Sequence, residues 1–396
     1  MIQGIFASHQ GIVGDRVGDF ASAILQYNPT GTALFLALTS GMPKAGASDT
    51  VFNWVEDSHQ PGRSAIVSGG TTTTVVVDDG SYYVPGAVLL VEETGEHMLV
   101  TSTAGDSLTV IRGLAGTAVT SVNNTMNVQQ IGNAHEEGSL MPVAVTQQGH
   151  PRLNYVQIFR NAWAITGTAK AITFRTGNRL AKNKKEAAMF HAEDMERAFL
   201  WGRKHIGTLN NKQFRMTDGL VAQIENYGGV IETADSGGNA GDVSLEDFED
   251  FMRRVFELNI KGQPNERTIL TGNQVLAVVQ KLTRLNAQYN ITQGETKLGI
   301  NVTTIQTVFG KFNFLTHPLM NESPYFSKEM YVIHPGAIRK RTLRETNEEG
   351  YDANGKRIAG IDADQGVITT ETGLEVGGAR TMGIYRNISV GVEDAA

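Results

Sequence analysis

The sequence of 396 residues contains no cysteine, which excludes disulfides, thiolate metal sites and cysteine nucleophiles. Such a composition is typical of proteins made in a reducing cytosol. No apolar run approaches the roughly 18 residues that a membrane span requires. Residues 1–15 also lack the basic region and the long apolar segment of a signal peptide. The sequence therefore indicates neither membrane insertion nor signal-peptide export.

Motifs that carry chemistry are also scarce. No G-x-x-x-x-G-K-[ST] or G-x-G-x-x-G sequence is present to bind phosphate, and no G-x-S-x-G or H-E-x-x-H sequence supplies a nucleophile or a zinc site. Residues 135–137, and the pair His191 and Asp194, offer too few ligands for zinc, so we interpret them as exposed polar residues. Asp362 and Asp364 would act as general acid and base only in a shared pocket, and in a glycine-rich tail they are typical of turns. We therefore predict no catalytic residue, no cofactor and no metal site.

The net charge of −7 is unevenly distributed along the chain. Residues 1–150 carry 4 basic and 13 acidic side chains, residues 151–215 carry 13 and 4, and residues 216–396 carry 17 and 24. A basic middle between acidic flanks suits either a polyanion site or contacts between identical subunits. Sites for single-stranded nucleic acid interleave basic residues with stacking aromatics, and this stretch does not. The pattern therefore favours contacts between subunits.

The first 140 residues divide into two parts. Residues 1–62 contain short apolar pieces separated by Gly and Pro, which predicts an arm that covers its apolar residues on the body or on a neighbouring subunit. Residues 63–140 contain short runs of branched side chains with turn sequences between them, which predicts an inserted β module, a small barrel or sandwich. The predicted strands are Thr72–Val77, Val88–Glu92, His97–Thr101, Leu108–Ile111 and Met126–Ile131.

Residues 141–179 contain two β-prone runs, Asn154–Ile165 and Lys170–Arg175, on either side of the turn sequence Thr166–Ala169. This pattern predicts an extended hairpin. A hairpin this short has no core of its own and must lie on another surface. We therefore predict that residues near its tip contact a neighbouring subunit: Trp163, Ile165, Lys170, Ile172 and Arg175. We interpret Lys170 as a solvated charge; the alternative is an isopeptide bond to a neighbour's Asn.

The longest predicted helix is Leu180–His205, because no Gly or Pro interrupts it before Gly202. Its predicted apolar face consists of Ala188, Ala192, Met195 and Phe199. A helix of this length usually serves as a support for other elements.

After residue 216, helical and strand patterns alternate without βαβ regularity. Ser244 with Asp247 resembles a capping box at the start of a helix, and Gly310-Lys311 predicts a two-residue turn between strands. The tail after Thr342 contains β-like pieces separated by glycine-rich turns. This order of elements predicts an α+β architecture.

Four stretches carry a family likeness. They are Gly113–Thr117 (GLAGT), Gly132–Gly138 (GNAHEEG), Asn154–Phe159 (NYVQIF) and the turn Thr166–Thr168. Together with the long helix and the capped second helix, they resemble the major head (major capsid) proteins of tailed bacteriophages over roughly residues 70–390.

The resemblance implies a Hong Kong 97-like fold, with the β module at 63–140 as an addition to its minimal form. The implied parts are an N-terminal arm (1–62), an extended hairpin loop (141–179), the spine helix of a peripheral domain (180–216), an axial domain (217–342) and a return to the peripheral domain (343–396).

The function that the resemblance implies is structural and not enzymatic. The subunit would associate with itself into hexamers and pentamers of an icosahedral head that encloses double-stranded DNA without sequence specificity. Implied partners are a portal protein and possible scaffold and cement proteins. The implied location is the virion, assembled in the bacterial cytoplasm without a membrane. Two alternatives remain open from the residues: another virion or encapsulin-like shell protein, and a phage hydrolase with paired carboxylates.

Overall fold

The computed structural model describes residues 45–57, 62–142, 144, 149–174, 178–260, 262–286, 291–293, 303–349 and 362–391. Most of the predicted arm, residues 1–62, lies outside these ranges. The chain divides into two compact units. The main unit comprises Met1–Trp54 and Arg152–Ala396, and the barrel unit comprises Val55–Pro151.

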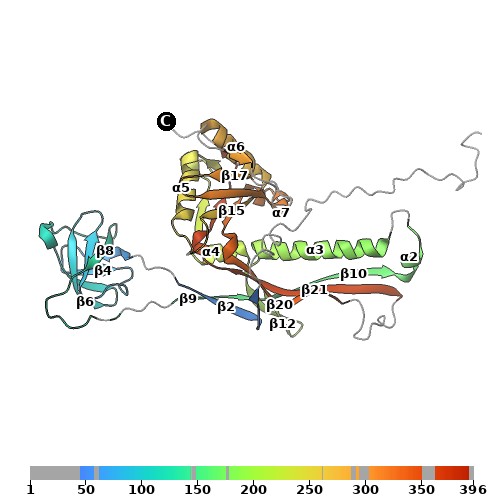
Figure 1. The fold of residues 1–396 in the computed structure, drawn as a ribbon, viewed down its shortest axis with the longest axis horizontal. Coiled ribbons are helices and arrows are strands. Elements are labelled where there is room, and N and C mark those ends of the chain that lie inside the picture. The colour runs from blue at the N-terminus through green and yellow to red at the C-terminus, as the bar shows by residue number, and fades with distance from the viewer. Residues whose placement is uncertain are drawn as a thin grey trace, which may run out of the picture. The chain divides into compact units, whose positions relative to one another are not determined.

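A long four-stranded sheet forms one part of the main unit (Figure 1). Its strands, in spatial order, are β1 (Ala45–Gly46), β20 (Ile338–Glu349), β21 (Ala363–Val376) and β10 (Gln157–Thr166). Every residue of β10 pairs with β21 in an antiparallel ladder, from Gln157 opposite Thr372 to Thr166 opposite Ala363. The two paired strands β10 and β21 are therefore some 200 residues apart in sequence.

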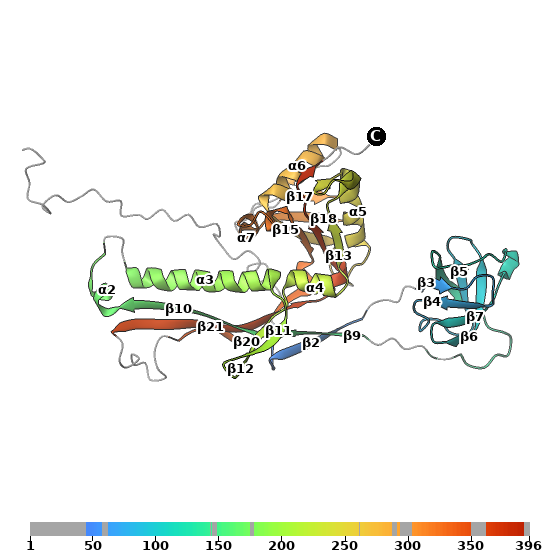
Figure 2. The ribbon, with the colours of Figure 1, turned by 180° about the vertical axis from the view of Figure 1, so that it is seen from behind.

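The helix α3 (Arg179–Trp201) runs alongside β10 and β21 (Figures 1 and 2). The Asn178 side chain accepts hydrogen bonds from the backbone N–H groups of Leu180 and Ala181, which satisfies donors that the first helical turn leaves free. Gly202 ends the helix, and its N–H donates to the carbonyl of Ala198. The residues that α3 buries are Ala187, His191, Met195, Glu196, Phe199 and Leu200.

Two details of the predicted helix are wrong. The helix ends at Trp201 and not at His205, because the chain turns at Gly202 into a hairpin of β11 (His205–Leu209) and β12 (Lys212–Met216). Ala188 is exposed, because the buried face is displaced by one residue and includes His191. The predicted stripe counted only apolar residues and so missed this buried histidine.

The second sheet of the main unit has seven strands, which contribute to one apolar core with α5 and α6 and to another that they share with α3 and the long sheet. In spatial order they are β13 (Val230–Thr233), β22 (Gly383–Arg386), β19 (Met330–Ile333), β15 (Glu266–Thr271), β18 (Lys311–Thr316), β17 (Thr303–Gln306) and β16 (Ile291–Gln293). Two further pairs are β14 (Asp242–Val243) with β23 (Val390–Gly391), and β2 (Val51–Glu56) with β9 (His150–Tyr155).

Short helices complete the main unit. They are α2 (Gly167–Ala171), α4 (Leu220–Asn226), α5 (Leu245–Phe256), α6 (Asn273–Asn286) and α7 (Pro318–Asn321). The capping box of α5 is confirmed: the Ser244 hydroxyl accepts from the N–H of Asp247, and the Asp247 carboxylate accepts from the N–H of Ser244. Buried apolar residues of α5 and α6, such as Phe251 and Val275, pack into the core of the seven-stranded sheet.

The barrel unit contains a closed barrel of strands in the order β3-β4-β7-β6-β5-β8. Their bounds are β3 (Arg63–Ser68), β4 (Thr74–Val77), β5 (Ala87–Val91), β6 (His97–Ala104), β7 (Ser107–Ile111) and β8 (Asn127–Asn133). Alternate residues point inward, as in β5, where Ala87, Leu89 and Val91 are fully buried. All five predicted strands of this region are present, and β3 is an additional one.

Three other local predictions are wrong. The predicted second strand of the hairpin, Lys170–Arg175, is not formed by its described residues, 170–174: Lys170 lies in α2, and the partner of β10 is β21. The loop between β17 and β18 has four residues, because Lys311 already pairs with Gln306 in the ladder. Asp364 lies in β21 and not in a turn. The errors at residues 170–174 and at Asp364 arose because a local pattern was read without its distant partner strand.

Candidate functional site

The candidate site is the end of the long sheet, where β10 passes into α2. Thr166 is the last residue of β10, and its hydroxyl accepts a hydrogen bond from the N–H of Ala169, which caps α2. The N–H of Gly167 donates to the carbonyl of Asp362, just before β21 begins. These bonds fix the start of α2 to the end of the neighbouring strand.

An ion pair also joins α2 to β21. The Nζ atom of Lys170 lies 2.5 Å from Oδ2 of Asp364, whose side chain is only 3 % exposed, whereas that of Lys170 is 46 % exposed. A buried carboxylate requires a cation or hydrogen-bond donors, and Lys170 supplies one. Lys170 is therefore a structural contact within this chain rather than a freely solvated charge. The carboxylate of Asp362 lies close to Gly167, and its side chain is exposed, whereas Asp364 is buried.

Trp163 and Ile165 point into the chain itself, with side chains 4 % and 6 % exposed. Trp163 packs with Ala187 of α3 and Ile368 of β21. The ammonium of Lys184 lies 4.4 Å from the centre of the indole ring, a cation–π distance. The two residues can therefore support a contact surface, but they offer a neighbour little area of their own.

The exposed apolar side chains at this end follow α2. Ile172 is 54 % exposed and Phe174 is 37 % exposed. They line a shallow, half-open pocket together with Lys170, Arg179 and Leu180. The fifth predicted contact residue, Arg175, lies outside the described residues. The sequence pattern did not single out Phe174, although it stands two positions from Ile172 in the same run.

A buried polar cluster lies between α3 and the long sheet. The Nδ1–H of His191 donates to Oδ1 of Asn161 at 2.7 Å, and Nε2 lies 2.7 Å from the hydroxyl oxygen of Thr370. Burial lowers the pKa of His191, and Lys340 lowers it further, against the opposing charge of Asp194. The neutral ring therefore joins β10, β21 and α3. The spacing of Ala187, His191 and Met195 at i, i+4 and i+8 is the signal that places this histidine on the buried face.

A second buried pair anchors the other half of α3. The Nε2 atom of His317 lies 2.6 Å from Oε1 of Glu196, and both side chains are 1 % exposed. Nearby, the indole N–H of Trp201 donates to the hydroxyl of Tyr331, which donates to the carboxylate of Glu329. Burial raises the pKa of Glu329. These contacts fix α3 to the region before β19 and so connect the long sheet with the seven-stranded sheet.

Within the described residues, no three His, Asp or Glu side chains are grouped closely enough to hold a metal ion. No described helix combines the length and the apolarity that crossing a bilayer requires. The features that stand out at this site are instead an edge strand, a capped loop and exposed apolar side chains.

Comparison with known proteins gives the class of the molecule. Residues 5–389 match the sequence profile of the SU10 major capsid protein family, and the chain belongs to this family. The major capsid protein of Pseudomonas phage PaMx41 is 28 % identical over 379 residues, which cover 90 % of this chain and 89 % of that protein. The chain is thus a major capsid protein of a tailed phage, a structural protein of the virion shell.

The fold agrees with this assignment. The capsid of a native GTA particle superposes with a TM-score of 0.51 at 9 % identity, covering 97 % of this chain and 99 % of that chain. At this identity the likeness is one of fold alone. It confirms a mixed α and β fold of the phage-capsid type, and the family favours the capsid interpretation over the encapsulin-like and hydrolase alternatives.

Proposed function

We propose that this subunit builds an icosahedral head from hexamers and pentamers, and that the head encloses double-stranded DNA. The structural feature that supports this proposal lies at the end of the long sheet. There β10 is the edge strand, and Ile172 and Phe174 expose apolar surface. An edge strand and apolar side chains both gain stability when another surface covers them. A repeated, head-to-tail contact of this kind produces rings when its rotation closes.

The contact residues of this proposal have two roles. Ile172 would supply contact area, and Arg175, three positions further along the sequence, would add a positive charge. Trp163 would act from beneath by holding β10 against α3 and β21, Ile165 is buried two residues further along β10, and Lys170 holds α2 to Asp364. The neighbouring subunit would therefore contact a loop whose conformation is fixed by buried residues.

The division into parts follows the same proposal. Residues 1–62 would be the arm, 141–179 the extended loop, 180–216 the spine, 217–342 the axial domain and 343–396 the return to the peripheral domain. The module at 63–140 would be an addition to the minimal Hong Kong 97-like fold. The separate apolar core of the barrel supports this view, since it needs no residue from the main unit.

The further partners would be a portal protein and, where the phage encodes them, scaffold and cement proteins. Assembly would take place in the cytoplasm of the bacterial host. The residues outside 62–142 carry a net charge of −1 and so no excess of positive charge, and the DNA would therefore be confined by the shell and not tightly bound to it.

Negative-stain electron microscopy of the purified chain tests the proposal. The chain is expressed alone and together with its neighbouring genes. Uniform polyhedral shells in either preparation are the expected result. A monodisperse monomer under both conditions would overturn it.

A further inference from the structure

The charge of the barrel differs sharply from that of the rest of the chain. Residues 62–142 contain eight Asp and Glu residues but only two basic residues, Arg63 and Arg112, and no lysine. Their net charge is −6, whereas the other residues together, with 33 acidic and 32 basic side chains, carry −1. The barrel therefore holds almost all of the negative charge of the protein.

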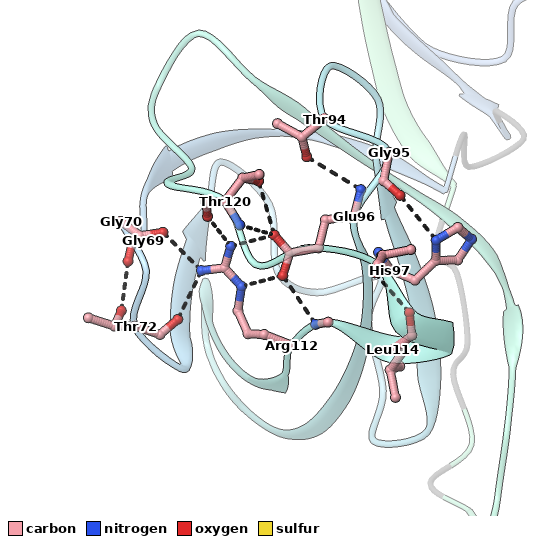
Figure 3. A network of polar contacts seen from close by, with 12 residues as sticks. Gly69, Gly70, Thr72, Thr94, Gly95, Glu96, His97, Arg112, Leu114 and Thr120 are labelled. Atoms are coloured by element: carbon pink, nitrogen blue, oxygen red, sulfur yellow. Dashed lines mark hydrogen bonds and ion pairs between the residues drawn. The ribbon is translucent and has the colours of Figure 1, made fainter.

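One of the two arginines is turned inward. The guanidinium of Arg112 makes two hydrogen bonds to the Glu96 carboxylate, Nε to Oε1 at 2.8 Å and Nη2 to Oε2 at 2.6 Å (Figure 3). The exposed fractions of these side chains are 5 % for Arg112 and 0 % for Glu96. The remaining N–H groups of Arg112 donate to backbone carbonyls, among them that of Gly70 at 2.9 Å. Arg112 therefore presents no charge to an external partner.

The other arginine is also occupied. Arg63 donates from both Nε and Nη2 to the carboxylate of Glu92, at 2.7 and 2.8 Å, which is the two-pronged geometry that binds a carboxylate best. A phosphate would have to displace Glu92 to reach it. Both cations of the barrel are thus neutralised by its own carboxylates.

The six carboxylates that remain come from separate connections of the barrel. They are Asp78, Asp79, Glu93, Asp106, Glu136 and Glu137, of which all but the partly exposed Asp79 are exposed. Residues 62–142 contain no further lysine or arginine to offset them. The negative charge is consequently spread over several turns and not confined to one patch.

Such a surface is unsuited to a compartment filled with DNA. Duplex DNA carries one negative charge per roughly 1.7 Å of its axis, and proteins approach it through lysine and arginine. Like charges repel within a screening length of about 8 Å at physiological salt. We propose that the barrel lies on the outer, DNA-free side of the shell. This inference rests on the proposed function, in which the shell encloses DNA.

A Glu-specific protease tests the inference on unaltered particles. Intact DNA-filled heads are digested, and the cleaved peptide bonds are identified by mass spectrometry. Cleavage after Glu136 or Glu137, in an exposed segment, is expected in intact heads at the rate found for heads that have been opened. Protection in intact heads together with cleavage in opened heads would overturn the proposal.

A charge-reversal variant gives a second, independent measurement. Glu136→Lys with Glu137→Lys changes the charge of each subunit by four, and the mobility of intact heads is measured in a native agarose gel. A slower migration toward the anode is expected, since outer charge dominates the mobility of a closed particle. Unchanged mobility of DNA-filled heads would contradict the outer location. Failure of the unaltered chain to form any shell would instead refute the proposed function, so the two failures are distinguishable.

Discussion

At the scale of single residues, the stability of the barrel depends on the buried pair of Arg112 and Glu96. Burial raises the pKa of Glu96, but the hydrogen bonds and the charge of Arg112, with the N–H of Thr120, outweigh burial and leave this pKa below its usual value. The carboxylate is therefore ionised in the folded barrel, and it needs its cation. Removing one partner of such a pair leaves an uncompensated charge in the interior.

We predict that Arg112→Met destabilises the barrel by about 3–5 kcal/mol, the usual range when one partner of a buried pair is lost. This loss of stability is measured by amide hydrogen exchange, which is expected to be faster in β6 and β7 of the variant than in the parent chain. The matched control is Arg63→Met, which removes the partly exposed pair with Glu92 and is expected to cost about 0–1 kcal/mol. Equal effects of the two substitutions would contradict the structural role of Arg112.

A second residue-scale prediction concerns acid sensitivity. His191 is neutral in the folded chain because its pKa is lowered, chiefly by burial, whereas in the unfolded chain it titrates near about 6.5. The unfolded state therefore binds more protons below that pH, and the contribution of His191 to stability, present above about 6.5, is lost as the pH falls toward its lowered folded pKa. His334, whose pKa burial also lowers, acts in the same direction.

We predict that the free energy of unfolding falls between pH 7.5 and 5.5, and that it falls less in His191→Gln. The difference is at most about 1.4 kcal/mol per pH unit, the limit for one proton. Urea titrations at the two pH values, followed by the fluorescence of the three tryptophans, measure it. An identical slope in both proteins would show that His191 does not titrate on unfolding.

At the scale of elements, the proposed contact loop at the end of the long sheet allows folding and assembly to be tested separately. Ile172 and Phe174 are exposed and contribute little to the core, whereas Trp163 and Ile165 lie within it. We predict that Ile172→Asp with Phe174→Asp leaves the melting temperature of the subunit nearly unchanged but prevents shell formation. Calorimetry and electron microscopy of the same preparation provide the two readings.

The control for this prediction is Val67→Asp on β3, which alters an exposed valine of the barrel. Shells are expected from the control and not from the double variant. Normal shells from both would refute the assignment of the loop as a contact.

The same elements explain what the sequence could predict and what it could not. The barrel strands, α5 with its capping box and most of α3 follow from local periodicity and capping, because these depend on neighbours a few residues away. The partner of β10 does not, because β21 follows it by some 200 residues in the chain and no local signal names it. The inward position of Trp163 and the pairing of Lys170 with Asp364 depend on that same partner. The orientation of the predicted contact residues therefore does not follow from the sequence, and their contact with a neighbour stays a prediction.

At the scale of the whole molecule, the barrel and the main unit have separate cores. The barrel core is built from residues 66–128, and the two large cores of the main unit include none of them. We predict that replacing residues 62–142 with a short Gly-Ser linker leaves a folded main unit. Its seven-stranded sheet should be as well protected against amide hydrogen exchange as that of the parent chain. Calorimetry should show one unfolding transition fewer than in the parent chain, because the barrel is missing. Loss of protection in β15 and β19 would mean that the main unit depends on the barrel.

The absence of lysine from the barrel has a practical consequence. No lysine occurs between Lys44 and Lys170, so a reagent that couples to amines modifies the main unit and leaves the barrel untouched. A carbodiimide, which activates carboxylates, reaches the barrel through Glu136, Glu137 and the other turn residues. Because carboxylates occur in both units, only the amine label distinguishes them: a dye coupled to lysine marks the main unit of the unaltered chain and leaves its barrel unmodified.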